Sequence, residues 1–113
     1  MIMSGGSRGI GEAIAVRAAR DGANIALLAR TSDPGPVLHG TIHTAAATIE
    51  AAGGKALPLV GDITDDAFVL DAVERTVATF GDIDLVINNA STIDLTPTDA
   101  IPMERYDLMA AVN

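Results

Sequence analysis

Ser4-Gly5-Gly6-Ser7-Arg8-Gly9-Ile10-Gly11 is the stretch that decides the fold of this chain. It follows the apolar residues Met1-Ile2-Met3 and leads into a helical pattern that begins at Glu12. A glycine-rich turn between a strand and a helix lets the backbone turn tightly and lets a phosphate approach it closely. The free N–H groups and the dipole of the following helix favour the negative charge. The stretch therefore predicts a site for a nucleotide diphosphate, with a merely structural turn as the alternative.

The spacing of these glycines differs from two common phosphate-binding loops. It is Gly5-x3-Gly9-x-Gly11, not G-x-G-x-x-G, and no Gly-Lys-Ser/Thr follows as in a Walker loop. Glycine spacing alone is a weak signal. The position between a strand and a helix is what favours a nucleotide site.

Strand and helix patterns alternate from one end of the chain to the other. They predict strands at 1–3, 24–29, 56–60 and 84–88, and helices at 10–21, 42–52, 67–80 and from Pro102, as first helical residue, to the end. Thr41 and either Asp65 or Asp66 are expected to cap helices. Strands separated by single helices predict right-handed βαβ units, and thus an α/β fold with a parallel sheet. Ligands of such sheets bind beyond the carboxyl ends of the strands, where the glycine-rich stretch and the turn at 88–90 would meet.

The composition places the chain among single-domain globular proteins. Its 113 residues have room for one domain, residues 1–113, and 49% of them are hydrophobic. A net charge of −8 argues against a nucleic-acid partner, because proteins that bind nucleic acids usually carry a basic stripe on their surface. No run approaches the roughly 20 apolar residues of a membrane span, and the sequence has no basic leader and no cysteine. We expect a cytoplasmic protein that binds neither nucleic acid nor membrane.

The end of the second predicted strand, Ala29-Arg30-Thr31, bears on the choice of cofactor. Sites for NAD(H) usually carry an Asp or Glu about 20 residues after the glycines, which binds the ribose 2′-hydroxyl. Here an arginine stands in that place, and Arg8 adds a second one inside the glycine-rich stretch. Two guanidinium groups can hold a phosphate through charge-assisted hydrogen bonds. The pattern favours NADP(H) over NAD(H), against the alternative that both arginines are solvated surface groups.

Two further strand ends carry polar side chains. Asp62, after the third predicted strand, could accept a hydrogen bond from an adenine amino group, or it could serve the turn in which Asp65 and Asp66 also lie. Asn88 and Asn89, after the fourth, could tie neighbouring strands together through their amides or form an Asx turn. The residues alone leave both choices open.

A metal site is not predicted. The loop at 31–40 contains the turn cluster Asp33-Pro34-Gly35-Pro36, and His39 near its end is four residues from His43. Gly40 and the capping Thr41 put His39 outside the following helix. No third ligand is evident in the sequence, whereas a zinc site takes at least three.

Together these motifs resemble the short-chain dehydrogenase/reductase family. The family's glycine motif Thr-Gly-x-x-x-Gly-x-Gly matches residues 4–11 with serine for threonine, and its Asn-Asn-Ala-Gly motif matches residues 88–91 with serine for glycine. The stretch Gly40-Thr41-Ile42-His43-Thr44-Ala45-Ala46 is most similar to the hydroxysteroid dehydrogenase-like branch. The resemblance covers the whole chain and implies a Rossmann-like, doubly wound parallel sheet. The chain would hold strands 3-2-1-4 of that sheet and lack strands 5–7.

The resemblance also implies which residues hold the cofactor. Family members carry an Asp after the third strand that touches adenine, which matches Asp62, and basic residues at the places of Arg8 and Arg30 mark NADP-preferring members. The full implied set is Gly5, Ser7, Arg8, Gly9, Ile10, Gly11, Arg30, Asp62, Ile63, Asn89, Ala90 and Ser91.

The family's catalytic set is an Asn, a Ser, a Tyr and a Lys, the last two spaced Tyr-x-x-x-Lys. Asn113, the last residue, matches the asparagine, which supports the proton relay. Tyr106 is followed four residues on by Ala110 and is predicted to be an ordinary helix residue. We therefore expect the cofactor-binding part of a longer domain, cut short at both ends and catalytically inactive alone.

The predicted function of the intact protein is hydride transfer between NADP(H) and a carbonyl compound or secondary alcohol. The alternative is a non-catalytic nucleotide-binding or interaction module that pairs with a full-length relative through the last helix. In family members this helix packs at a subunit interface, so we expect a homo-oligomer and exposed Leu108, Met109 and Val112. An open fourth strand and a short first strand imply marginal stability for the chain alone.

Overall fold

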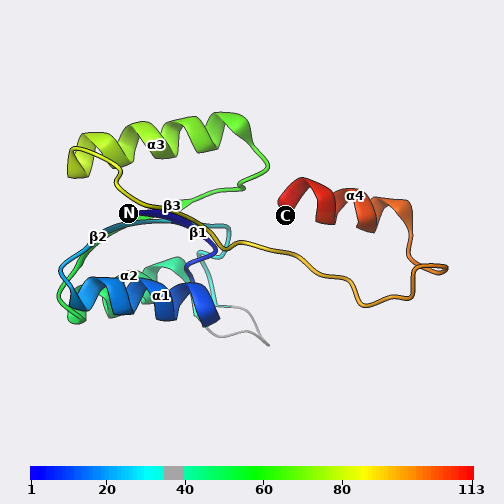
Figure 1. Cartoon of the computed structure of the whole chain (residues 1–113), viewed down its shortest axis with the longest axis horizontal. Helices are drawn as coiled ribbons and strands as arrows, with labels where there is room; N and C mark the ends of the chain where they lie inside the picture. The colour runs from blue at the N-terminus through cyan, green and yellow to red at the C-terminus, as the bar shows by residue number, and fades with distance from the viewer. Residues whose placement is uncertain (35–39) are drawn as a thin grey trace.

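A computed structural model describes residues 1–34 and 40–113 of the chain. Strands and helices alternate along it, which confirms the predicted α/β class (Figure 1). The elements are β1 (Ile2–Ser4), α1 (Gly9–Arg20), β2 (Asn24–Ala29), α2 (Ile42–Ala51), β3 (Lys55–Val60), α3 (Asp66–Phe80), β4 (Val86–Asn88) and α4 (Met103–Val112).

The strands of the described chain form one parallel sheet in the order β3-β2-β1-β4. β1 lies inside it, with Met3 opposite Leu27 of β2 on one side and Ile87 of β4 on the other. β3 is an outer strand and contains Pro58. Proline cannot donate a ladder hydrogen bond, so within sheets it is tolerated mainly on such outer strands. This is the predicted Rossmann-like, doubly wound order.

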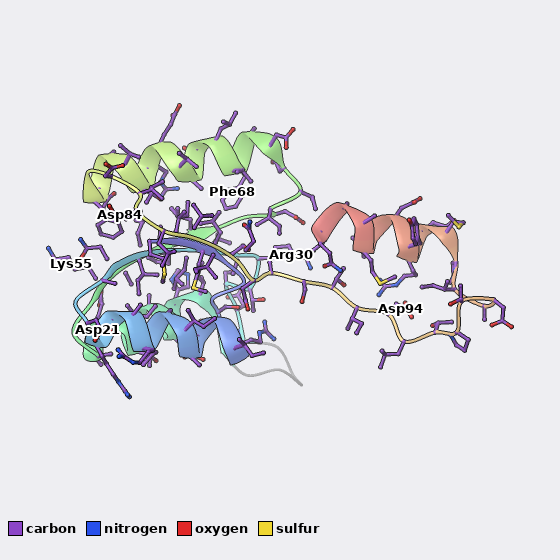
Figure 2. All side chains as sticks on the ribbon, viewed as in Figure 1. Asp21, Arg30, Lys55, Phe68, Asp84 and Asp94 are labelled. Atoms are coloured by element: carbon purple, nitrogen blue, oxygen red, sulfur yellow. The ribbon has the colours of Figure 1, made fainter. Side chains whose placement is uncertain are left out.

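Helices cover both faces of the sheet: α1 and α2 lie on one face and α3 lies on the other (Figure 1). Alternate residues of β2 serve the two faces. Ile25 and Leu27 belong to the core beneath α1 and α2, whereas Ala26 and Leu28 belong to the core beneath α3, into which Phe68 also packs (Figure 2). Because β2 is covered on both sides, its sequence is a continuous aliphatic run and not an alternating one.

The helix starts follow local hydrogen-bonding chemistry. Thr41 caps α2: its hydroxyl accepts from the Thr44 N–H at 3.1 Å, while the Thr44 hydroxyl accepts from the Thr41 N–H at 2.8 Å. Asp65, and not Asp66, caps α3, since its carboxylate accepts from N–H groups of the first turn. Thus the predicted cap at Thr41 is confirmed, and the choice between the two aspartates falls on Asp65.

Two predicted boundaries are wrong. The strand predicted at 84–88 pairs only over Val86–Asn88, because its neighbour β1 offers three residues to pair with. Pro102 is not the first helical residue but the N-cap, since its backbone is still extended (φ −65°, ψ 144°) where the loop enters α4. The other ends lie within one residue of the prediction. Part of the predicted turn cluster at 33–36 lies outside the described residues.

α4 stands apart from the sheet, at the end of the long loop that leaves β4 (Figure 1). None of the described residues of α4 is buried; Leu108 is exposed, whereas Met109 and Val112 are half-buried. The predicted exposure is thus correct for Leu108 alone. Arg105 and Asn113 lie four residues to either side of Met109, on the same face of α4. Both residues bond to the loop that follows β4, so the loop folds back onto this face. Within residues 1–34 and 40–113, no helix combines the length and the apolar character that crossing a membrane demands.

Candidate functional site

The glycine-rich stretch connects β1 to α1, and its glycines are needed for two different reasons. Gly5 and Gly9 have positive φ angles of 72° and 58°, which residues with side chains rarely adopt. Gly11 is needed for space, since a Cβ there would overlap the Gly5 carbonyl oxygen and lie 2.6 Å from Asn89 Nδ2. The result is a tight turn that packs closely against Asn89 and Ala90 at the end of β4.

Hydrogen bonds tie this turn to the end of β4. The Asn89 side-chain amide donates through Nδ2 to the carbonyl oxygens of Gly5 at 2.9 Å and Ser4 at 3.3 Å. In return, the Ser4 hydroxyl accepts from the N–H groups of Asn89 at 3.2 Å and Ala90 at 3.1 Å. Asn89 therefore ties neighbouring strands together, one of its two predicted alternatives. The sequence interpretation missed the part played by Ser4, although its place in the motif was a signal for it.

The N-terminus of α1 opens at the same end of the sheet. In the described structure its N-cap, Arg8, makes no side-chain cap to the first turn. Instead, the Arg8 guanidinium donates from Nη2 to the Thr31 hydroxyl at 2.7 Å. Uncapped N–H groups and the helix dipole favour an anion at this place. Thr31 was also missed by the sequence interpretation, although its hydroxyl directly follows the predicted cation Arg30.

Arg30 and Asp62 follow the neighbouring strands β2 and β3 and form an ion pair, with Arg30 Nη1 3.3 Å from Asp62 Oδ2. The other carboxylate oxygen, Oδ1, accepts from the N–H and the hydroxyl of Thr64 at 2.9 and 2.8 Å. The hydrogen bonds from Thr64, foremost the backbone one, and then the charge of Arg30 hold the pKa of Asp62 below its ordinary value. Asp62 therefore serves the turn after β3, as one alternative predicted, and is ionised at neutral pH.

A cavity of about 520 Å³ lies at the carboxyl ends of the strands, a size typical of small-molecule sites. It is lined by all twelve residues predicted to hold a cofactor: Gly5, Ser7, Arg8, Gly9, Ile10, Gly11, Arg30, Asp62, Ile63, Asn89, Ala90 and Ser91. Five lining residues were not predicted: Leu28, Ala29, Thr31, Gly61 and Val112. Of the predicted site residues, Asn113 lies outside this lining, directly after Val112. A second cavity, of about 460 Å³ between α3, β1 and β4, is lined mostly by aliphatic side chains.

Two ties hold the loop after β4 to α4. The Thr92 N–H donates to Asn113 Oδ1 at 3.0 Å, and Asn113 Nδ2 donates to the Thr92 carbonyl oxygen at 3.0 Å. Farther along the loop, Arg105 Nε donates to Asp94 Oδ2 at 2.7 Å. Hydrogen bonds from the Thr96 side chain and then from Arg105 lower the pKa of Asp94 to about 2.

His39, one of the two histidines considered as metal ligands, lies outside the described residues. Among the residues that are described, no three His, Cys, Asp or Glu side chains gather where they could hold a metal ion. The phenol of Tyr106 belongs to an exposed residue of α4.

Known proteins of one family are similar to this chain in sequence and in structure. All of residues 1–113 match the family model for short chain dehydrogenase. Hydroxysteroid dehydrogenase-like protein 2 of Danio rerio is 56% identical over 113 residues, which are all of this chain and 27% of that protein. The Homo sapiens protein of the same name is 53% identical with the same coverage. The predicted similarity to the hydroxysteroid dehydrogenase-like branch is confirmed.

Solved structures share the fold. A short chain dehydrogenase of Mycobacterium thermoresistibile has a TM-score of 0.96 at 56% identity, over 99% of this chain and 40% of that one. An NADH-dependent reductase solved with NAD has a TM-score of 0.80 at 28% identity, over 98% of this chain and 44% of that one. The chain thus spans less than half the length of each of these relatives. With a family model matched by every residue, a parallel sheet in the expected order and a glycine-rich turn at its carboxyl edge, the chain belongs to the short chain dehydrogenase family.

Proposed function

We propose that the cavity at the carboxyl ends of the strands binds NADP(H), and that the intact oxidoreductase transfers a hydride between NADP(H) and a carbonyl compound or secondary alcohol. One observation carries this proposal: the twelve predicted residues, from separate segments of the chain, converge on one cavity. Free backbone N–H groups and two guanidinium groups at one place fit a ligand with several phosphates. The nicotinamide ring, when bound, is the group that gives or accepts the hydride.

Each segment would hold a different part of the cofactor. Gly9 leaves the backbone at the start of α1 open to the pyrophosphate, since no atom lies within 4 Å of where its Cβ would stand. Arg8 and Arg30 would bind the 2′-phosphate of the adenosine ribose, and Asp62 and Ile63 would lie along the adenine. The segment 89–91 would complete the cavity on the β4 side.

The preference for NADP(H) over NAD(H) rests on the charges at the end of β2. Arg8 reaches Thr31, one residue beyond Arg30, so both guanidinium groups serve the same end of the cavity. A phosphate on the ribose would gain charge-assisted hydrogen bonds from them, whereas a bare 2′-hydroxyl would gain much less. One solved relative, the NADH-dependent reductase, uses the other cofactor. The preference is therefore a property to be tested on this chain's own arginines.

Asn113, which the family resemblance assigns to the proton relay, would act by its position. Its side-chain oxygen and nitrogen are both engaged with the backbone of Thr92. Thr92 directly follows Ser91, a cavity residue. Asn113 would thus support a relay by holding the end of α4 against the cavity wall.

We propose that residues 1–113 alone bind the cofactor without turning it over. The one tyrosine, Tyr106, is followed four residues on by Ala110, so the Tyr-x-x-x-Lys pair is not among these residues. Lys55 begins β3, at the end of the sheet opposite the cavity. A proton donor with a lysine to tune its pKa would have to come from elsewhere.

The proposal includes a homo-oligomer formed through α4 and a cytoplasmic location. α4 exposes Met103, Tyr106 and Leu108, and none of its described residues is buried. The same exposed helix also supports the second candidate function, a non-catalytic module that pairs with a full-length relative. Light scattering of the chain at several concentrations tests self-association, and fractionation of the source cells tests the location.

The decisive experiment is a titration of the chain with NADPH and NADH, followed by the fluorescence of the reduced nicotinamide. We expect tighter binding of NADPH, and no steady oxidation of NADPH in the presence of a panel of aldehydes and ketones. Arg8→Gln combined with Arg30→Gln should weaken NADPH binding more than NADH binding. Arg17→Gln is the control, since Arg17 is an exposed arginine of α1 paired with Asp21, outside the cavity lining. Tighter binding of NADH, or steady turnover by the chain alone, would contradict the proposal.

A further inference from the structure

The cation proposed to bind the 2′-phosphate already has an anionic partner. Arg30 Nη1 lies 3.3 Å from Asp62 Oδ2, and both residues line the cavity. The pair joins the ends of two neighbouring strands, since Ala29 of β2 is in register with Val60 of β3. A phosphate that binds Arg30 must therefore meet the Asp62 carboxylate as well.

The Asp62 carboxylate is held in its place. Thr64 donates two hydrogen bonds to Oδ1, which leaves Oδ2 directed at Arg30. The preceding residue, Gly61, donates its N–H to the Ala29 carbonyl oxygen at 3.1 Å. The Phe68 ring packs so closely on Gly61 that a Cβ there would overlap it. The turn that carries Asp62 is thus fixed on three sides.

Arg30 is held much less firmly. Its side chain is 68% exposed, and its 3.3 Å distance to Asp62 is longer than the 2.7–2.9 Å typical of a charge-assisted hydrogen bond. Arg8 differs, because its 2.7 Å bond is to the neutral hydroxyl of Thr31. Of the two arginines at this end of the cavity, Arg30 is the one whose charge is partly neutralised, and the weak pair can be broken by a stronger anion.

We propose that Asp62 is a specificity-determining residue: its carboxylate competes with the 2′-phosphate of NADP(H) for Arg30 and so limits the preference for NADP(H) over NAD(H). NADP(H) must displace the carboxylate from Arg30 before its 2′-phosphate can pair fully with the guanidinium. NAD(H) has no 2′-phosphate and does not meet this cost. The inference rests on the proposed function of this cavity and goes beyond it, because it assigns the degree of selectivity to an acid and not to the arginines alone.

The test is Asp62→Asn, with dissociation constants for NADPH and NADH measured by fluorescence titration at one fixed ionic strength. Asparagine keeps an Oδ1 acceptor for Thr64 and for adenine, but it loses the charge that holds Arg30. An exposed ion pair has a small coupling, so the ratio Kd(NADH)/Kd(NADPH) should rise roughly two- to five-fold. Asp66→Asn is the matched control: it removes the same charge from the exposed first turn of α3, outside the cavity lining, and should leave the ratio unchanged.

The same substitution in an Arg30→Gln background separates competition from general repulsion. Asp62→Asn should change the ratio there by much less than in the parent chain. An equal rise in both backgrounds would overturn the inference, because Asp62 would then act on the phosphate without Arg30. An unchanged ratio, with both nucleotides weakened together, would also overturn it and leave NADP(H) binding standing. No binding of either nucleotide by the parent chain would overturn the proposed function and the inference with it.

A measurement on the unmutated chain keeps the test valid if Asp62→Asn does not fold. The Hε resonance of Arg30 should shift when NADP⁺ is added, since its pair with Asp62 is broken. NAD⁺ should shift this resonance much less, because it has no 2′-phosphate. Equal shifts of the Arg30 resonance with the two nucleotides would contradict the competition.

Discussion

The side-chain amide of Asn89 donates to the carbonyl oxygen of Gly5 at 2.9 Å, which joins the end of β4 to the first turn after β1. The two residues are 84 positions apart in the chain. The bond closes the edge of the proposed cofactor cavity where two parallel strands end side by side. It also occupies the space beneath Gly11, so the glycine motif and the asparagine motif depend on each other.

Asn89→Ala should lower the free energy of unfolding by about 1–3 kcal/mol, because two half-buried carbonyl oxygens lose their donor. Chemical denaturation followed by circular dichroism measures this. The matched control is Asn88→Ala at the preceding, exposed position, where we expect a change within about 0.5 kcal/mol. Equal losses at the two positions would show that the tie to Gly5 has no special weight.

Gly11→Ala should destabilise the chain by about 1–3 kcal/mol through overpacking, even though alanine is the better helix former. The added Cβ would overlap the Gly5 carbonyl oxygen and lie 2.6 Å from Asn89 Nδ2. In an Asn89→Ala background the extra loss should be smaller, since one of the two crowded atoms is gone. Denaturation of the two single variants and the double variant measures this coupling, and strictly additive losses would argue against the crowding.

Asn113→Ala should loosen the loop after β4, because Thr92 loses both of its bonds to the end of α4. Amide hydrogen exchange at Thr92 should become roughly five-fold faster, as expected for one lost hydrogen bond. Asn113→Asp is the matched variant, since it keeps the Oδ1 acceptor for the Thr92 N–H and should retain most of the protection. Unchanged exchange in Asn113→Ala would mean that the loop is held by other contacts.

The tie between Asp94 and Arg105 should fail in acid. Hydrogen bonds from Thr96 and Arg105 lower the pKa of Asp94 from 3.8 to about 2 in the folded chain. Because the folded-state pKa is the lower one, the stabilisation is present above pH 3.8 and is lost as the pH falls towards about 2. The ¹³Cγ resonance of Asp94, followed by NMR over this range, measures the titration. Arg105→Gln should move the midpoint upward, and an unmoved midpoint would show that Arg105 does not contribute.

The alternation of strands and helices follows from the sequence because each element depends on near neighbours. The continuous aliphatic run of β2 and the cap at Thr41 act over a few residues and were predicted correctly. The element boundaries that depend on a neighbouring strand or loop were not predicted correctly. β4 is three residues long because β1 is, and Pro102 remains extended because of the loop that precedes it.

The candidate site was predictable as a set of residues, because the glycine and asparagine motifs and the basic and acidic strand ends are visible in the chain. What each side chain does there was less predictable. Thr31, which accepts from Arg8, and Ser4, which receives two backbone N–H groups, gain their roles from residues 23 or more positions away.

By itself, therefore, the sequence determined the kind of fold, the place of the cavity and twelve of the residues that line it, since strand ends in a parallel sheet must gather at one edge. Only the tertiary structure decided how those residues are paired. Arg30 lies against Asp62 because β2 and β3 are adjacent in the sheet, a contact between positions 32 residues apart that no local pattern encodes. Asn113 reaches Thr92 because the loop after β4 folds back along α4.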